Sequence, residues 1–448
     1  MNLRIAVATF AIGCSSVVYS QDAAKKADKQ PEKVAPAKAK SLKEVVLSSL
    51  MNHPQIKKLE KGRDVAYQDI LSAQGSYLPT VDLRAAYGQE TVQNQTVEND
   101  RDYTRTSWTQ ESSLTVNQTL FDGGERYGRL SRTRALFDRS INSIADGKEA
   151  LAQRAVEAYI SVLKARKQIA LSEQNIAAHK DILDIVNKRF KNKLVPEADV
   201  VQVQGRLALA QAQLRREIAG LKVTIASFIE VTGEEPVELE EPGRIEKVIP
   251  EDLKAAQNEA VTNHPSILAN KDTIKAVEAS VDEVYSRYYP KFSLELSGAE
   301  NENLGGVQEN DDKYSIKLVM NWNLFRGGSD SADITKEIFR REQETENLFE
   351  TKRNLARDVA QAWYQKIGRL EELGFFEKHE IASGKTYEAY KSQYELGKQI
   401  TLFDLLNARS EFFRAKFNVI DAQYDIINNE YRILATMGKL VEFFERLK

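Results

Sequence analysis

Side chains that could catalyse a reaction or hold a metal are scattered along the chain. The sequence has four histidines and one cysteine. His53 and His264 each stand inside an Asn-His-Pro tripeptide, and His179 and His379 are far from both in the sequence. Their spacing matches no metal site or catalytic triad, whereas a turn followed by proline is typical of a helix start. The sequence therefore predicts a protein that is not an enzyme, with no cofactor and no catalytic or metal site.

Acidic and basic side chains are nearly balanced. The chain of 448 residues has 66 Asp and Glu against 63 Lys and Arg, which gives a formal net charge of −3. The carboxylates stand beside Lys and Arg within helical patterns, where solvated surface charge is the ordinary role. The chain lacks the basic excess that binds polyanions, so nucleic acid is not expected as a partner.

The N-terminus has the pattern of an export signal. Arg4 precedes an apolar run and Val18-Tyr19-Ser20 is a small-residue cleavage site, which predicts a signal peptide over residues 1–20. Residues 21–41 are rich in Ala, Lys, Gln and Pro and predict a disordered periplasmic leader. A lipoprotein site with Cys14 acylated is the alternative. In either case the mature protein is expected to leave the cytoplasm.

The rest of the chain contains two copies of one plan. The Asn-His-Pro tripeptide around His53 recurs around His264, and Leu-Phe-Asp-Gly-Gly at 120–124 recurs as Leu-Phe-Arg-Gly-Gly at 324–328. Further landmarks follow in the same order, which chance does not produce. Two structural repeats are therefore predicted, over residues 42–245 and 246–448.

Each repeat contains a stretch in which apolar and polar residues alternate. These stretches predict β-hairpins over about 80–121 and about 291–325. In the second hairpin Leu318, Met320 and Trp322 share one face, which we expect to face lipid. A sheet with one face on a soluble core is the alternative, but the sequence offers no partner layer. Four strands of about ten residues, the length that a tilted strand needs to cross a bilayer, cannot close a membrane barrel, so closure requires several chains.

The segments after the hairpins predict long helices. Two stretches of roughly seventy residues are rich in helix formers and lack proline, and at 1.5 Å per residue each would reach ~100 Å. A return helix follows each, so long helix pairs are predicted over about 124–232 and about 328–438. In the second return helix, apolar residues spaced by three and four from Phe403 to Leu434 predict a coiled-coil seam. An ordinary coiled-coil rod is the alternative.

Several features, in this order, resemble the TolC family of outer-membrane efflux proteins. They are the repeat, the hairpins that close on the two Gly-Gly sequences, and the turn sequences around Asp199 and Asp404. The resemblance covers the chain from about Ser41 to about Lys439. It implies a mainly α fold with a membrane β-barrel. In this TolC-like fold a homotrimer shares a 12-stranded β-barrel, four strands per protomer, and long coiled-coil helices form a periplasmic α-barrel. The strand-to-helix joints would be Gly123, Gly124, Gly327 and Gly328.

The resemblance also assigns roles to the turns between the long and return helices. It implies adaptor-contact tips at Asn192, Lys193 and Leu194 and at Leu396, Gly397 and Lys398. Glycine is usual at the centre of such a turn. The first tip has none, so it departs from the family, which predicts altered docking there. A periplasmic aperture is implied at Asp199, Tyr394, Asp404 and Asn407. A hydrogen bond between Tyr394 and Asp199 is expected to help close it.

The family's location is the outer membrane, in contact with its lipids and extending into the periplasm. The implied partners are two further copies of the chain, a periplasmic adaptor of the membrane fusion type, and an inner-membrane ABC transporter or other pump. We expect an outer-membrane exit duct of a tripartite export system. Type I protein secretion is favoured, because the turn at 400–408 is similar to secretion-type members. Multidrug efflux is the alternative, and a non-channel periplasmic coiled-coil scaffold is the third.

Overall fold

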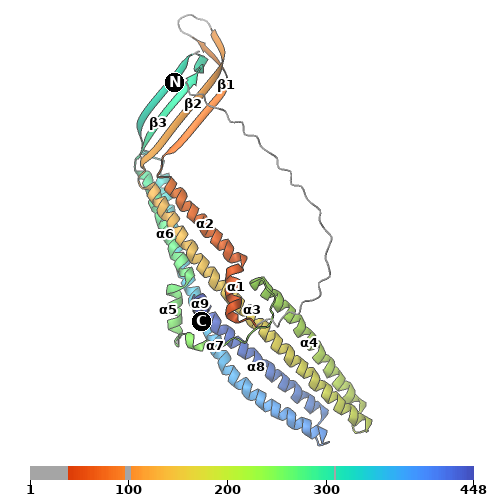
Figure 1. Ribbon diagram of the computed structural model, residues 1–448. Coiled ribbons are helices and arrows are strands. Elements are labelled where there is room, and N and C mark those ends of the chain that lie inside the picture. Colours follow the sequence, from red (N-terminus) through yellow and green to blue (C-terminus); the bar gives the residue numbers. More distant parts are fainter. Residues whose placement is uncertain (1–38, 96–101, 307–308, 448) are drawn as a thin grey trace. The chain divides into compact units, whose positions relative to one another are not determined.

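The computed structural model describes residues 39–95, 102–306 and 309–447 (Figure 1). The predicted signal peptide, Cys14 and most of the predicted leader lie outside the described residues. The end of that leader belongs to the fold, because the Lys40 N–H donates to the carbonyl oxygen of Glu238 and Ser41 caps the first helix. Lys40 and Ser41, which we expected within the disordered leader, therefore have defined contacts in the fold.

The same succession of elements occurs twice: two helices, a β-hairpin, a helix of 67 residues and a return helix. The predicted mainly α class with four strands is confirmed for the described chain. In chain order the elements are α1 (Leu42–Asn52), α2 (Pro54–Gly75), β1 (Thr80–Gln95), β2 (Asp102–Phe121), α3 (Glu125–Lys191), α4 (Glu197–Thr232), η1 (Glu246–Val248), α5 (Leu253–Asn263), α6 (Pro265–Tyr285), η2 (Ser286–Tyr288), β3 (Lys291–Glu302), η3 (Leu304–Gly306), β4 (Asn310–Asn321), α7 (Ser329–Glu395), α8 (Leu402–Thr436) and α9 (Leu440–Arg446).

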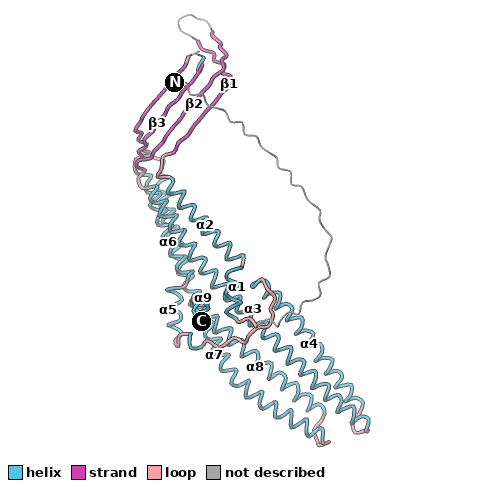
Figure 2. The backbone as a smooth tube through the Cα atoms, in the orientation of Figure 1, coloured by secondary structure: helices cyan, strands magenta, loops and turns pink. Residues whose placement is uncertain are grey.

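The four strands form one antiparallel sheet in the order β1-β2-β3-β4, which Figure 2 shows beyond one end of α2 and α6. The first hairpin is longer than the ten residues per strand that we expected, since β1 has 16 residues and β2 has 20. Its pairing continues into polar sequence, where the Thr91 and Thr106 hydroxyls lie 2.9 Å apart. Backbone pairing does not require an apolar alternation, so the alternation underestimated the strand length.

The last strand is shorter than the predicted hairpin. β4 ends at Asn321, which pairs with Lys291. The next partner would be Pro290, which has no N–H to donate to a ladder. Trp322 therefore lies just beyond the strand, and its indole Nε1 donates to the carbonyl oxygen of Tyr288 at 3.2 Å. The prediction that Trp322 is a strand position is wrong for this reason.

The histidines of the Asn-His-Pro turns begin helices, as predicted. His53 is the N-cap of α2 and His264 is the N-cap of α6. In each, Nδ1 accepts a hydrogen bond from the backbone N–H two residues later, at 3.1 Å and 3.2 Å. Pro54 and Pro265 occupy the first helical positions, where the missing N–H costs nothing.

Glycine pairs stand between strand and long helix in both repeats. All four glycines, Gly123, Gly124, Gly327 and Gly328, have φ between 63° and 96°, a region that penalises residues with a Cβ. Gly123 also lacks room for a side chain, since a Cβ there would lie 2.6 Å from the carbonyl oxygen of Ser286. The chain can turn here without a steric penalty.

The residues beside the glycine pairs form an ion pair in each repeat, with the acidic and basic positions exchanged. In the first repeat the Asp122 carboxylate accepts from Nε of Arg126 at 2.6 Å and from the N–H of Gly124 at 3.1 Å. At the matching positions of the second repeat, Nη1 of Arg326 lies 3.3 Å from Oδ1 of Asp330. The difference between Leu-Phe-Asp-Gly-Gly and Leu-Phe-Arg-Gly-Gly thus exchanges the charges and keeps an ion pair at the joint.

The main apolar core surrounds the middle of α3. Leu151 and Tyr159 of α3 are buried there in one cluster with Val46 of α1, Leu434 of α8 and Leu440 of α9. The sequence favoured long coiled-coil pairs, and this core shows that short elements also pack on the long helices.

The connection between the repeats is fixed to this core by polar contacts. Tyr159 Oη lies 2.9 Å and 2.7 Å from the carbonyl oxygens of Lys40 and Glu240. Glu430 of α8 is fully buried, and its Oε1 accepts from Nη2 of Arg244 at 2.7 Å. Its Oε2 accepts from the N–H of Ile245 at 2.9 Å. A buried carboxylate with these partners is satisfied and ties the connection to α8.

Candidate functional site

The predicted tips lie at the ends of α3 and α7 remote from the sheet (Figure 1). At the first tip the N–H of Lys193 donates to the carbonyl oxygen of Phe190 at 2.8 Å. The N–H of Leu194 donates to the carbonyl oxygen of Arg189 at 2.9 Å. These two bonds make a Schellman motif, which satisfies carbonyl groups that the end of a helix would otherwise leave free.

The second tip has the same pattern at the end of α7. The N–H of Gly397 donates to the carbonyl oxygen of Tyr394 at 3.1 Å, and the N–H of Lys398 donates to that of Gln393 at 3.0 Å. Leu396 stands at the position that Asn192 holds in the first tip, and both residues are exposed. The two repeats therefore build the same turn from different residues.

The centre of each turn has a left-handed backbone. Gly397 has φ 72°, and Lys193 has φ 56° at the matching position. This conformation costs an ordinary residue roughly 1 kcal/mol, which glycine avoids. The missing glycine does not change the turn itself, because Lys193 takes the glycine conformation and the hydrogen bonds are the same; altered docking at the first tip stays a prediction.

Arg189 of α3 joins the two tips. Its Nη1 donates to the carbonyl oxygen of Tyr394, and its guanidinium lies over the Tyr394 ring with Cζ 4.6 Å from the ring centroid. The last turn of α7 has no basic residue of its own. A cation near a helix C-terminus is favourable because the free carbonyls carry partial negative charge. Arg189 therefore supplies from α3 the charge that α7 lacks.

The hydrogen bond that we expected between Tyr394 and Asp199 is absent from the described structure. Tyr394 is 3% exposed, yet its hydroxyl has no hydrogen-bond partner among the described residues. Burial raises the pKa of Tyr394, the Arg189 charge lowers it and the Asp199 charge raises it. Asp199 is half-buried in the first turn of α4. The contacts of Tyr394 with Arg189 involve its ring and its backbone carbonyl, not its hydroxyl.

Asp404 takes part in the start of α8. Its backbone N–H donates to Thr401 Oγ1 at 3.2 Å, and its Oδ2 accepts from the Thr401 N–H at 3.2 Å. This reciprocal pair is a capping box. Asn407 lies half-buried one turn later. The aperture role that the resemblance implies for Asp404 stays a prediction, while its capping role was missed, although Thr-x-x-Asp is a visible signal.

An apolar cluster lies directly above the tips. It joins Ile182 and Val186 of α3, Val203 of α4, and Leu405 and Leu406 of α8, all of them fully buried. Of the predicted seam in α8, Leu406 belongs to this cluster. Phe403 does not, because its side chain is 55% exposed. The seam prediction is therefore wrong at its first position, where Leu402 and Leu405 of α8 join the cluster and Phe403 does not.

A buried arginine lies further along α8, and the sequence gave no signal for it. Arg409 is 7% exposed, and its Nε donates to Oδ1 of Asn175 at 3.0 Å. Its Cζ lies 5.2 Å from the centroid of the Tyr387 ring. His179 is buried nearby, where burial first and then the Arg409 charge lower its pKa to about 4. These contacts join α3, α7 and α8 but contain no nucleophile poised for catalysis.

Glu149 of α3 is a second buried ionisable group. It is 5% exposed, and its carboxylate accepts hydrogen bonds from the N–H of Leu440 at 3.0 Å and of Val441 at 3.1 Å. Burial raises its pKa from an ordinary 4.5 to about 7, and the charges of Asp146 and Glu442 add to the effect. The carboxylate holds the beginning of the last helix, α9.

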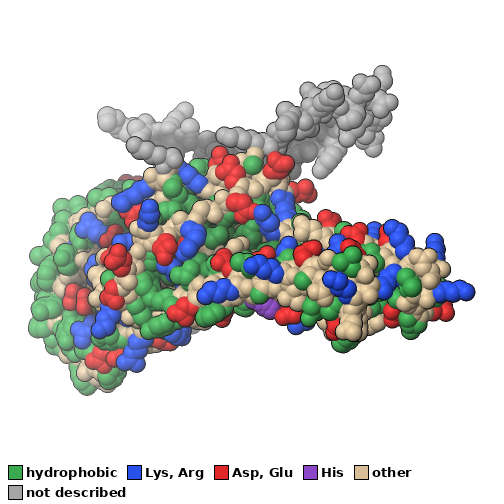
Figure 3. All heavy atoms as spheres, turned by 90° about the horizontal axis from the view of Figure 1, so that it is seen from below, with side chains coloured by type: hydrophobic (Ala, Val, Ile, Leu, Met, Phe, Trp, Pro, Cys, Tyr) green, Lys and Arg blue, Asp and Glu red, His purple; other side chains and the backbone are tan. Residues whose placement is uncertain are grey.

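The sheet has one exposed apolar face. Leu318 is 67% exposed and pairs with Leu294, and Met320 is 56% exposed and pairs with Phe292. Trp322, beyond the strand end, is 52% exposed. The opposite face carries polar pairs such as Glu295 with Lys317. In the space-filling view, acidic and basic side chains are interspersed over the visible surface with hydrophobic side chains between them (Figure 3).

Two further observations concern the described ranges as a whole. No three His, Cys, Asp or Glu side chains of these ranges gather closely enough to hold a metal ion. No helix within 39–95, 102–306 and 309–447 carries an apolar stretch long enough to cross a membrane.

Comparison with known proteins gives matches along both repeats. The family model described as outer membrane efflux protein matches residues 45–218 and 256–439. Outer membrane protein TolC of Salmonella enteritidis is 22% identical over 419 residues, which are 91% of this chain and 83% of that protein. Alkaline protease secretion protein AprF of Pseudomonas aeruginosa is 22% identical over 353 residues, which are 77% of this chain and 72% of that protein.

A solved structure has the same fold. The Campylobacter jejuni CmeC outer membrane channel superposes with a TM-score of 0.78 at 15% identity, over 89% of this chain and 86% of that one. The resemblance to the TolC family and the outer-membrane location are thereby confirmed. With two long helix pairs, a four-stranded sheet and a family match across both repeats, the chain belongs to the outer membrane efflux protein family and is a channel protein of the outer membrane.

Proposed function

We propose that three copies of this chain form the outer-membrane exit duct of a tripartite export system. The observation that carries the proposal is the four-stranded open sheet, whose edge strands β1 and β4 have no partner among the described residues. Unpaired edges and exposed Leu318 and Met320 are costly in water. Joining β4 of one copy to β1 of the next closes a 12-stranded barrel, pairs every edge and turns the apolar face to lipid.

The long helices support the same assembly. α4 exposes Leu209 and Val223, at 60% and 69%, and α7 exposes Phe339 and Phe375, at 62% and 71%. A helix that buries one face and exposes apolar side chains on another has a second packing surface. Helices of neighbouring copies provide that surface in a periplasmic α-barrel. A non-channel scaffold is set aside because the family consists of outer membrane efflux proteins.

Type I protein secretion is the favoured transport function, with multidrug efflux as the alternative. The relative AprF is named for secretion of alkaline protease, and the turn at 400–408 favours the same role. The family description supports efflux. In both cases an inner-membrane transporter, an ABC transporter in type I secretion, supplies the energy, and a periplasmic adaptor contacts the tips at 192–194 and 396–398.

Deletion of the chain in the producing organism separates the two functions. Type I secretion predicts that a large protein disappears from the medium and is retained in the cell. Efflux predicts greater sensitivity to antibiotics and detergents with an unchanged set of secreted proteins, and that result would overturn the favoured function.

The aperture residues form a second part of the proposal. Asp199, Tyr394, Asp404 and Asn407 all lie at the tip end of the helices, near the narrow periplasmic entrance of a trimer. Three copies of Asp404 around one axis would favour cations. Asp404→Asn removes the charge but keeps an oxygen for the capping box, so we expect weaker cation selectivity in planar bilayers with normal assembly. Unchanged selectivity would place Asp404 away from the constriction.

A further inference from the structure

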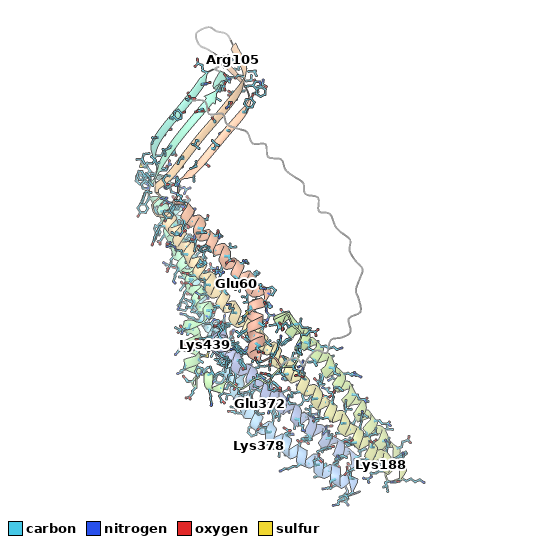
Figure 4. All side chains as sticks on the ribbon, in the orientation of Figure 1. Glu60, Arg105, Lys188, Glu372, Lys378 and Lys439 are labelled. Atoms are coloured by element: carbon cyan, nitrogen blue, oxygen red, sulfur yellow. The ribbon has the colours of Figure 1, made fainter. Side chains whose placement is uncertain are left out.

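The two tips share one backbone geometry but differ in charge. Residues 188–194 contain four basic residues and no acidic one, whereas the matching residues 392–398 contain Lys398 and Glu395. Lys188, Lys191 and Lys193 are exposed, and none forms an ion pair with a described carboxylate. Figure 4 places Lys188 at the end of α3 where the chain turns toward α4.

Helix capping accounts for these lysines only in part, because Lys188 and Lys191 are in the last turn of α3 whereas Lys193 lies beyond the helix. Basic residues are favourable at a helix C-terminus, but α7 ends in the same motif without one in its last turn. Arg189 already serves that need at α7. Lys193 further keeps a left-handed backbone in which glycine would be unstrained. A lysine at a backbone position that favours glycine points to a use for its charge.

The lysines surround apolar side chains at the first tip. Leu194 is 65% exposed and Phe190 is 41% exposed. An apolar centre with a charged rim is the usual composition of a protein docking surface. The rim selects the partner by charge, because opposite charges steer association and like charges repel.

The geometry points to a docking surface at the first tip for an acidic segment of the periplasmic adaptor, with Asp or Glu against Lys188, Lys191 and Lys193 and an apolar residue against Leu194. This inference rests on the proposed function, since it names the chemistry of the adaptor in that export system. It also separates the two tips: charge selects the partner at the first, and the nearly neutral second tip contributes little to that choice.

The test uses the full-length chain in the producing cells with a water-soluble carbodiimide as the probe. This reagent joins a lysine amine directly to a carboxylate that it touches, and mass spectrometry identifies both peptides. We expect crosslinks from Lys188, Lys191 or Lys193 to Asp or Glu of another periplasmic protein. The triple change Lys188→Glu, Lys191→Glu and Lys193→Glu should lower the amount of that complex by about tenfold or more, because three attractions become repulsions.

The matched control changes three exposed lysines away from the turns to glutamate, Lys180, Lys378 and Lys385. It alters the net charge equally and should leave the complex within about twofold of the unchanged chain. Equal amounts of outer-membrane trimer must accompany both variants, so that a loss of complex is not a loss of folding. An equal effect of the two triple changes would overturn the inference.

Crosslinks from the first-tip lysines to other copies of this chain alone would also overturn it. If Lys398 of the second tip still crosslinks to the periplasmic protein while the first-tip lysines do not, the inference fails and the proposed function stands. If neither tip crosslinks to another protein and deletion changes neither secretion nor drug sensitivity, the proposed function fails and the inference fails with it.

Discussion

At the scale of single residues, Arg189 has the clearest structural role at the tips. It donates to the carbonyl oxygen of Tyr394 and covers the Tyr394 ring. The contact joins positions 205 residues apart, so no local sequence signal reports it. It also helps to bury Tyr394, whose hydroxyl has no hydrogen-bond partner among the described residues.

Arg189→Gln tests this role. Loss of a charged hydrogen bond at the end of α7 should cost about 1.5 kcal/mol, which is roughly a tenfold change in the local opening equilibrium. The amide hydrogens of Gly397 and Lys398 should therefore exchange about tenfold faster. Lys188→Gln is the control, since Lys188 is exposed and should leave both amides unchanged. Equal exchange in the two variants would contradict the role.

Glu149 predicts a pH dependence for the docking of α9. Its pKa is raised to about 7 in the folded state from an ordinary 4.5. A carboxyl whose folded pKa is raised contributes full stability below pH 4.5 and loses it as the pH rises through about 7. The difference corresponds to roughly 3 kcal/mol. Exchange of the α9 amides, corrected for intrinsic rates, should therefore speed up as the pH is raised from 5 to 8.

Glu149→Gln provides the control for that measurement. The amide does not titrate, so the corrected exchange rates of α9 should be the same at pH 5 and pH 8. A pH dependence that survives in the variant would assign the effect to another group, such as the nearby Asp146 and His264, which lie 3.7 Å apart.

At the scale of elements, the sheet divides into an apolar and a polar face. Alternation along the sequence predicted these faces, and the pairing of Leu318 with Leu294 and of Glu295 with Lys317 shows them in register. The glycine pairs and Asn-His-Pro turns were also visible because their backbone requirements are local.

Other features of the elements could not be predicted from local patterns. β4 ends at Asn321 because its partner strand begins after Pro290. The end of β4 thus depends on strand pairing and not on its own residues. The first tip keeps its geometry because Lys193 accepts a left-handed backbone, although glycine is the usual residue there. The buried contacts of Arg409 and Glu430 could not be predicted because their partners are distant in the chain: Arg409 bonds Asn175 of α3, and Glu430 bonds Arg244 in the connection between the repeats.

Two substitutions on adjacent residues of β4 test the faces. Leu318→Arg places a charge on the face proposed to contact lipid and should impair assembly by roughly 2 to 4 kcal/mol if it lies near the bilayer midplane. Val319→Arg places the same charge on the polar face, beside Lys317, and should be tolerated, as should Asn321→Ser. Heat-resistant trimer in outer-membrane fractions is the readout, and equal amounts for the two arginine variants would reject the assigned faces.

At the scale of the whole molecule, one chain supplies an incomplete sheet and incompletely covered helices. A closed ring of identical copies would pair the open edges of β1 and β4. The same ring would cover the exposed apolar residues of α4 and α7. A ring that joins one edge to the opposite edge of the next copy is a head-to-tail assembly, and it ends at a fixed number of chains only if the rotation closes. Closure by three chains is the central claim.

Cysteines on the two edge strands measure closure directly. Arg84→Cys on the polar face of β1 is combined in turn with Lys313→Cys, Ser315→Cys or Lys317→Cys on the same face of β4, which samples the possible registers. A disulfide forms only where two Cα atoms come within about 4.4 to 6.8 Å. In oxidised outer membranes we expect one pairing to give a covalent species of three chains and none larger, while each single-cysteine chain stays uncrosslinked. Covalent dimers alone, an open ladder of larger species, or no covalent trimer with any of the three pairings would contradict a barrel closed by three copies.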